Sequence, residues 1–218
     1  MESQGSQAID ALLQKEYSVK IGDYLTRGWE LFKRNIGGFI AFTLIVIVIQ
    51  LILSVLNRKG VQVGSLISLI IAGPLSAGFL IVAFKLIRNR VTNFEDFFRG
   101  FSNFLPLFLV YLLTNILVGI GMIFLIIPGI YLAVAYLFSM AFVVERRLNF
   151  WDAMETSRKL ITKRWFSFFG LVLLLGLINL VGALLLGLGL LVTIPVSFCT
   201  IAAAYDDIVG VSASSVDL

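Results

Sequence analysis

Two long segments without a charged residue constrain the fold of this chain more than any other feature. The first lies between Leu105 and Val144 and the second between Trp165 and Tyr205, and neither contains Asp, Glu, Lys, Arg or His. A water-soluble domain cannot hide so much unbroken apolar length, whereas each crossing of a lipid bilayer requires about 20 consecutive apolar residues. The sequence therefore predicts an integral membrane protein.

The overall composition leaves little room for a second domain. Hydrophobic residues make up 59% of the 218 residues, and the mean hydropathy is +1.00. We expect a single integral membrane domain over residues 18–207, with a flexible N-terminus at 1–17 and a flexible C-terminal tail at 208–218. Histidine is absent and cysteine occurs once, which argues against a metal site, a cofactor and an internal disulfide.

Six transmembrane helices account for the apolar segments. The first pair should be separated by the polar turn that begins at Asn57, and the third pair should reverse near Gly187-Leu188-Gly189. The second pair should reverse either at Gly119-Ile120-Gly121 or at Pro128-Gly129, because Gly and Pro interrupt helices most easily. The predicted fold is an all-α polytopic membrane protein with six helices in three hairpins; a five-span alternative would leave the C-terminus outside. The expected spans are 36–56, 66–84, 103–119, 122–144, 166–186 and 190–206.

The basic residues favour one orientation in the membrane. Every Lys and Arg except Arg58 and Lys59 falls on the side from which the predicted hairpins start. Cytoplasmic loops carry such an excess of Lys and Arg, so we expect both termini in the cytoplasm and the hairpin tips outside. The net charge of +4, from 17 basic and 13 acidic residues, should attract anionic lipid headgroups rather than nucleic acid.

Three prolines indicate a threefold internal repeat. Each would lie about two turns into the second helix of its hairpin and bend that helix, so that three bent helices could line a central cleft. The alternative is coincidence, since Pro and Gly punctuate every hairpin of an apolar chain. Each proline is followed ten residues later by an aromatic residue: Pro74 by Phe84, Pro128 by Phe138 and Pro195 by Tyr205.

A short amphipathic segment precedes each predicted hairpin. In the second segment the phenylalanines follow i, i+3, i+4, i+7 spacing, typical of one apolar helix face, at Phe94, Phe97, Phe98 and Phe101. Thr92 with Glu95, and Asn149 with Asp152, have the spacing of a helix N-cap and its reciprocal acid. We expect three interfacial cytoplasmic helices that lie flat at the headgroup level, either as plain anchors or as a specific lipid-binding or partner-docking surface.

The candidate lipid-binding residues are basic and tryptophan side chains of these segments. Basic side chains attract lipid phosphate, and tryptophan favours the membrane interface. The side chains expected to face the headgroups are Trp29, Lys33, Arg34, Arg99, Trp151, Arg158, Lys163, Arg164 and Trp165.

No arrangement of residues indicates catalysis or ion-coupled transport. Apart from Asp206 at the very end of the last span, the predicted spans contain no Asp, Glu, Lys or Arg of the kind that proton and ion pathways use, and histidine, the commonest general base, is missing. We therefore predict a protein that is not an enzyme, although a hydrolase built on paired cytoplasmic carboxylates remains an alternative. A permease or channel for a lipidic or neutral solute is another alternative, with Asn115, Asn179 and Thr200 along its path.

Three strings carry a resemblance to a known family: Gly28-Trp29-Glu30-Leu31-Phe32-Lys33-Arg34-Asn35, Ile126-Ile127-Pro128-Gly129-Ile130-Tyr131-Leu132, and Phe150-Trp151-Asp152-Ala153-Met154-Glu155-Thr156-Ser157-Arg158-Lys159-Leu160. The chain resembles, over about residues 20–207, a group of prokaryotic integral membrane proteins that includes the YciC-like proteins and the membrane domain of some glycerophosphoryl diester phosphodiesterases. The resemblance implies a prokaryotic cytoplasmic (inner) membrane and a role near lipid metabolism or envelope upkeep. In those phosphodiesterases hydrolysis belongs to a separate soluble barrel, which this sequence lacks, so the resemblance implies no such activity here.

The function predicted from the sequence is that of a non-catalytic, lipid-interacting scaffold or accessory protein. Its expected partners are membrane lipids, anionic ones above all, together with a membrane-protein partner or further copies of the chain. The remaining alternative is a subunit of a larger membrane complex.

Overall fold

The protein is helical throughout the part that the structure describes. A computed structural model describes residues 11–57 and 63–211. These residues contain no β-strand, which confirms the predicted all-α class. The helices in chain order are α2 (Ile21–Arg34), α3 (Ile36–Asn57), α4 (Val63–Ile87), the 3₁₀ helix η1 (Phe94–Asn103), α5 (Phe104–Phe124), α6 (Ile126–Ala135), α7 (Ser139–Arg146), α8 (Phe150–Thr162), α9 (Trp165–Leu184) and α10 (Leu190–Ile208).

Six helical stretches within the described residues are long and apolar enough to cross a membrane. This finding confirms the prediction of a multi-pass membrane protein at the level of helix length and composition. The stretches are Ile36–Asn57, Val63–Ile87, Phe94–Phe124, Ile126–Arg146, Trp165–Leu184 and Leu190–Ile208, the third and fourth of which each combine two elements.

The chain reverses between α5 and α6 at a residue that neither predicted alternative named. Leu125 is extended, with φ −156° and ψ 124°, and it separates the end of α5 from the start of α6. Pro128 is therefore the third residue of α6 and lies in its first turn, not two turns inside a helix as predicted. Proline is tolerated there because the first N–H groups of a helix have no partner within it. The turn between α9 and α10 contains Gly187 at φ +75°, close to where it was predicted.

A hydroxyl group from α8 interrupts the helix formed by α6 and α7. Ser157 Oγ donates to the carbonyl of Ala135 at 2.8 Å and accepts from the N–H of Phe138 at 3.1 Å. A side chain inserted into the backbone ladder is a known cause of helix breaks. The interruption places α8 directly against the junction of α6 and α7.

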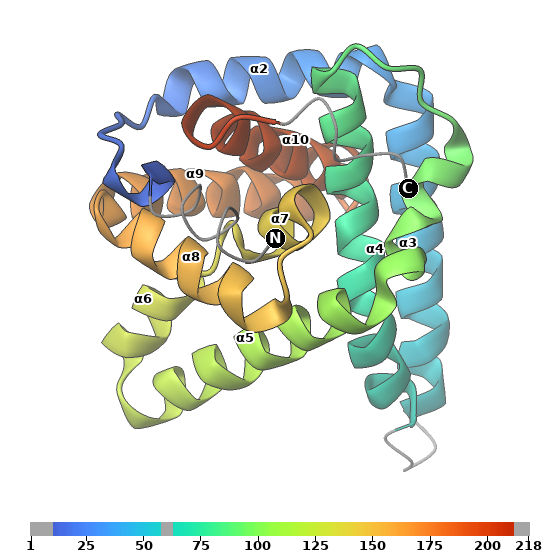
Figure 1. The fold of residues 1–218 in the computed structure, drawn as a ribbon. Coiled ribbons are helices and arrows are strands. Elements are labelled where there is room, and N and C mark those ends of the chain that lie inside the picture. Colours follow the sequence, from blue (N-terminus) through green and yellow to red (C-terminus); the bar gives the residue numbers. More distant parts are fainter. Residues whose placement is uncertain (1–10, 58–62, 212–218) are drawn as a thin grey trace.

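The helices pack in a closed circle of contacts. The segment before each helix pair packs on the second helix of the preceding pair: η1 on α4, and α8 on α7 and α6. The first segment closes the circle, because α2 packs on α10, the last helix of the chain (Figure 1). The first helix of each pair follows the same order, with α3 against α10, α5 against α4 and α9 against α6.

The second amphipathic segment forms a tighter helix than its spacing predicted. η1 is a 3₁₀ helix, in which side chains three apart share a face. Phe97 and Gly100 are therefore buried together, whereas Phe98 and Phe101 share another face and are about two-fifths exposed. Phe94, the first residue of the helix, is exposed to a similar extent. The predicted cap was one residue early, since the Asn93 N–H donates to the carboxylate of Asp96 at 2.8 Å.

The third amphipathic segment agrees with its prediction. The Asp152 N–H donates to Asn149 Oδ1 at 2.9 Å, so Asn149 caps α8. Met154, Ser157 and Ile161 are buried along one face of this helix.

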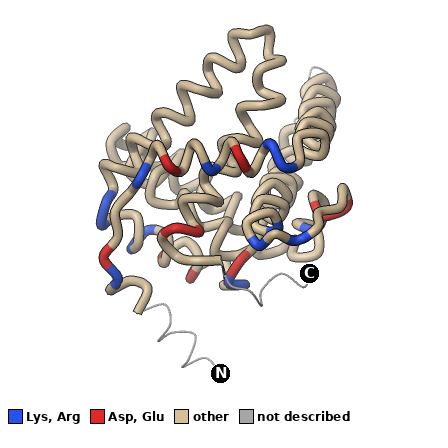
Figure 2. The backbone as a smooth tube through the Cα atoms, turned by 90° about the horizontal axis from the view of Figure 1, so that it is seen from above, with Lys and Arg blue, Asp and Glu red and all other residues tan. Residues whose placement is uncertain are grey.

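Buried residues and exposed apolar residues gather at opposite ends of the helix pairs. The core is formed by the C-terminal halves of α4 and α10, by α7, and by the faces of α2, η1 and α8 that pack on them. Large apolar side chains around the reversal of α5 and α6 are exposed, for example Ile123 at 83% and Ile127 at 81%. Figure 2 shows the charged residues gathered toward the lower part of the molecule, while an uncharged helix pair projects at the top.

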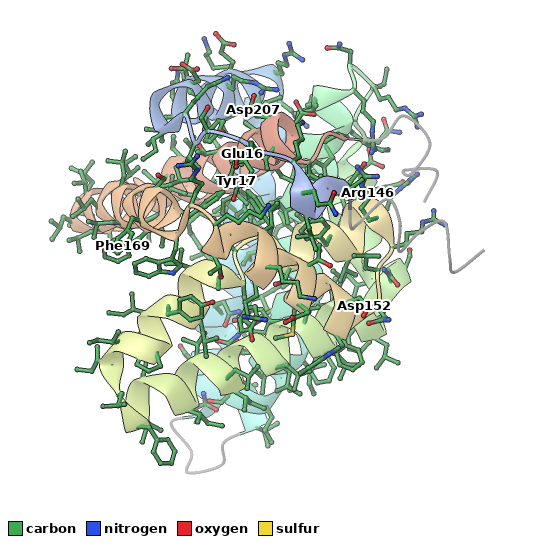
Figure 3. The ribbon with its side chains drawn as sticks, turned by 60° about the vertical axis from the view of Figure 1, so that its left-hand side comes forward. Glu16, Tyr17, Arg146, Asp152, Phe169 and Asp207 are labelled. Carbon is green, nitrogen blue, oxygen red and sulfur yellow. The ribbon has the colours of Figure 1, made fainter. Side chains whose placement is uncertain are left out.

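The residues at both ends of the described chain pack against its helices. The hydroxyl of Tyr17 donates to the carbonyl of Leu160 at 2.6 Å, and burial raises the pKa of Tyr17 to about 12. Figure 3 shows Glu16 and Tyr17 beside α8 and α9. At the other end Ile208 and Val209 are buried. The rest of both predicted tails, and the predicted outer-side residues Arg58 and Lys59, lie outside the described residues.

Candidate functional site

The aromatic residues that follow the three prolines meet in the core. The ring of Tyr205 lies 5.4 Å from that of Phe84 and 5.5 Å from that of Phe138, between ring centroids, and all three side chains are fully buried. Phe142 adds a fourth ring at 5.2 Å from Tyr205. Aromatic rings at such separations attract each other beyond the burial of their area. This aromatic cluster fills the space between α4, α6, α7 and α10.

Buried ion pairs join the helix ends next to the aromatic cluster. Nη2 of Arg88, just past α4, contacts both carboxylate oxygens of Glu145 in α7, at 2.5 and 2.6 Å. Lys85 Nζ lies 2.6 Å from the carboxylate of Asp96 in η1, which also pairs with Arg99 at 2.9 Å. Buried charges are tolerated only when they are paired and hydrogen-bonded in this way.

Ion pairs and hydrogen bonds also hold α2 against the end of α10. Arg27 Nη2 lies 2.6 Å from Asp206 Oδ2, and the hydroxyl of Tyr24 donates to Asp207 at 2.8 Å. Burial, followed by the hydrogen bond to Asp207, raises the pKa of Tyr24. The two helices approach closely at Gly28, where a Cβ would lie 2.3 Å from Thr200 Oγ1 and 2.7 Å from the backbone nitrogen of Thr200. Only glycine fits at this contact.

The predicted headgroup-facing residues fall into two groups. Trp29 and Trp151 are 45% and 59% exposed, and Lys33 is also exposed, so these three side chains are available to lipid. The second group contains four basic residues that bind other parts of the protein. Arg34 donates to the carbonyl of Leu86 and to Asn89, Arg99 pairs with Asp96, Lys163 donates to the carbonyl of Leu13, and Arg164 lies 3.8 Å from Glu16.

Arg158 and Trp165 lie close to the same tyrosine. Arg158 forms a two-pronged ion pair with Glu155 at 2.8 Å, which lowers the pKa of Glu155. The pKa of Arg158 is raised, chiefly by this pair and then by a hydrogen bond with the hydroxyl of Tyr131. That hydroxyl also lies 2.7 Å from Thr162 Oγ1. Trp165 Nε1 donates to the backbone carbonyl of Tyr131 at 3.3 Å.

A ladder of aromatic rings runs from this polar group into an apolar groove. The ring of Trp165 stacks on Tyr131 at 6.2 Å and on Phe169 at 5.2 Å, between centroids. Phe169 lies on α9 (Figure 3) and belongs to the wall of a groove of about 310 Å³ between α6 and α9. We call this space the α6/α9 groove. Its wall is almost entirely apolar, and its lining includes Ile130, Ala133, Val172, Leu173, Gly176 and Leu177.

The structure does not join the three residues of the predicted solute path. The side-chain amide of Asn115 donates to the carbonyl of Tyr111 within α5. That of Asn179 bridges α9 and α10 through Ser197 Oγ at 2.8 Å, and Thr200 is buried against α2. No hydrogen bond among the described residues connects Asn115, Asn179 and Thr200 with one another.

Sequence reasoning missed the groove and the buried ion pairs. The groove depends on how α6 and α9 diverge, and the partners Arg88 and Glu145 are 57 positions apart, so no local pattern marks either. The stacking of Trp165 on Phe169 could have been predicted from the sequence, because residues four apart on one helix lie next to each other.

Across 11–57 and 63–211, no three His, Cys, Asp or Glu side chains come together in a way that could hold a metal ion. The single cysteine, Cys199, is buried. Comparison of the chain with protein-family models, with curated proteins and with solved structures finds no match.

Proposed function

We propose that this protein is a multi-pass protein of the prokaryotic cytoplasmic membrane that binds anionic lipid without catalysis and serves as a scaffold or accessory factor. The observation that carries this proposal is the separation of charged from apolar parts (Figure 2). Lys and Arg residues surround the helix ends at which α2, η1 and α8 pack, while the opposite ends of the helix pairs expose large apolar side chains. Such a molecule fits a bilayer with its basic end at the cytoplasmic headgroups.

The helix pairs act as three membrane hairpins related by a threefold internal repeat. Two features support this proposal. The contacts follow one cyclic order, from each amphipathic segment to the second helix of the pair before it. The aromatic residues at the corresponding positions, Phe84, Phe138 and Tyr205, also meet in one cluster. The three cytoplasmic helices then form a collar at the headgroup level, with Trp29 and Trp151 as exposed interfacial side chains.

The same cluster favours lipid binding over a solute pathway. A permease requires a polar path between the hairpins, but the aromatic cluster fills that position with fully buried rings. The side chain of Asn115 bonds within α5 and that of Thr200 within α10, while the amide of Asn179 bridges α9 and α10. The open spaces along the spans lie at the sides of the helices and are apolar, as spaces for acyl chains are.

Lipid retention after gentle extraction tests the proposal. We expect the protein to retain phosphatidylglycerol in preference to phosphatidylcholine in native mass spectrometry. The combined substitutions Lys33→Gln, Lys163→Gln and Arg164→Gln should weaken this preference, because each exposed cation near the surface contributes about 1 kcal/mol of attraction to anionic lipid. Arg34 is left unchanged because it connects α2 to the end of α4 through the carbonyl of Leu86, whereas Lys163 and Arg164 are exposed and contact the segment before α2, at Leu13 and Glu16.

A matched variant neutralises three exposed carboxylates instead. Asp23→Asn, Glu30→Gln and Glu95→Gln remove the same number of charges of opposite sign from the same end of the protein. This variant should keep or strengthen the preference for phosphatidylglycerol. Equal retention of the two lipids by the unmodified protein would refute the proposed function.

A further inference from the structure

The α6/α9 groove is the most open junction in the circle of helices. α9 contacts α6 more sparsely than α3 contacts α10 or than α5 contacts α4. The gap is not closed by large side chains, because Ala133 lines it from α6 and Gly176 from α9. A Cβ built at Gly176 would meet no atom within 4 Å. The groove is therefore free space that faces outward along a membrane span.

The length of the groove matches one leaflet of a bilayer. Its wall on α9 extends from Phe169 to Leu180, which at 1.5 Å per residue is about 16 Å. Half of the hydrocarbon core of a bilayer is about 15 Å thick. An acyl chain that starts at the headgroup level would thus run along the whole groove.

The end of the groove nearest the basic end of the protein is suited to a headgroup. The ladder of Trp165 and Tyr131 marks this end, and both residue types favour the membrane interface. The hydroxyls of Tyr131 and Thr162 lie 2.7 Å apart beside Arg158. Basic side chains outnumber acidic ones here, with Arg158, Lys159, Lys163 and Arg164 against Glu155 and Glu16.

We propose that the α6/α9 groove is a binding site for one anionic phospholipid of the cytoplasmic leaflet. One acyl chain lies along Val172, Gly176 and Leu177, and the phosphate lies beside Tyr131, Thr162 and Arg158. The apolar wall of the groove matches an acyl chain, and the excess of basic side chains at its end matches an anionic headgroup. This site deepens the proposed function, on which it rests, by placing one specific lipid at one junction rather than a diffuse layer around the basic end.

Filling the groove tests the site. Gly176→Phe adds a ring at a position where a Cβ meets no atom within 4 Å, and in native mass spectrometry it should reduce the adduct of one phosphatidylglycerol by about tenfold. Ala133→Phe fills the groove from the opposite wall and should have the same effect, which covers the case in which one variant folds poorly. Gly119→Phe is the matched control, because Gly119 of α5 also has no atom within 4 Å of a built Cβ but does not line the groove.

A second pair of substitutions tests the headgroup end of the α6/α9 groove. The outcomes distinguish failure of this lipid site from failure of the proposed function. Arg158→Gln combined with Thr162→Val should reduce the selection of phosphatidylglycerol over phosphatidylcholine while the total number of retained lipids stays the same. If both groove-filling variants keep the one-lipid adduct at the level of Gly119→Phe, the groove is not the site, although the selection by the unmodified protein still supports the proposed function. Loss of a co-purifying protein instead of a lipid would also overturn the site. Absence of any selection in the unmodified protein overturns both proposals.

Discussion

At the scale of single residues, a close contact between two helices depends on glycine, which has no side chain. Gly28 has no Cβ, and this allows α2 to approach the backbone of Thr200 in α10. In the sequence Gly28 stood out only as the first residue of a string that resembles a known family. The helix that it contacts is more than 160 positions away in the chain, which no spacing rule can identify.

We predict that Gly28→Ala destabilises the protein by about 1–3 kcal/mol, the usual cost of forcing an extra methyl group into a packed contact. The built Cβ lies within 2.8 Å of three atoms of Thr200, two of which are backbone atoms that cannot turn aside. Thermal unfolding of the detergent-solubilised protein measures the effect. Gly22→Ala, in the first turn of the same helix, meets no atom within 4 Å and should be neutral or slightly stabilising. Equal unfolding temperatures for the two variants would contradict the packing of α2 on α10.

At the scale of elements, the sequence located the helices better than it located their ends and partners. Apolar length and amphipathic spacing placed the six spans and the segments around α2, η1 and α8, because both signals are local. The cap of η1 and the reversal at Leu125 were missed by a few residues. A 3₁₀ helix and an extended residue without Gly or Pro leave no strong mark in a pattern of 3.6 residues per turn. The packing partners of each segment were beyond prediction, since they lie in other helix pairs.

The buried pair Arg88–Glu145 connects two of these elements, and its removal should be costly. Glu145→Gln removes the charge of the carboxylate that Arg88 contacts, in a site where the Arg88 side chain is only 7% exposed, so we expect a loss of about 3–5 kcal/mol. Glu155→Gln disrupts an Arg–Glu pair of similar geometry, but both partners are about one-third exposed, so its cost should stay below about 1 kcal/mol. Chemical unfolding in detergent compares the two variants.

A double substitution separates the pair from other effects of the mutation. Arg88→Leu with Glu145→Leu removes both charges and should recover most of the stability lost by Glu145→Gln, because hydrophobic residues of similar size often replace buried ion pairs at little cost. If the double variant is less stable than Glu145→Gln, the loss does not arise from an uncompensated charge at Arg88.

At the scale of the whole molecule, the uneven distribution of charge predicts its direction in the membrane. We expect Lys159→Cys to react with a membrane-impermeant maleimide only after the cells are opened, and Lys59→Cys to react in intact cells. The natural Cys199 is fully buried and should contribute little background. Labelling of position 159 from outside would reverse the orientation, and the lipid site would then face the outer leaflet.

Because α2 packs on α10, the circle of helix contacts can close only at the end of synthesis. A ribosome makes α2 before every membrane helix and makes its partner, α10, after all of them. Until then the part of α2 around Tyr24 and Gly28, which packs on α10, lacks its partner, whereas Phe32 can already pack on Phe39 of α3. A nascent or truncated chain therefore displays an uncovered surface at the basic end of the protein, where chaperones and membrane proteases could distinguish unfinished molecules from finished ones.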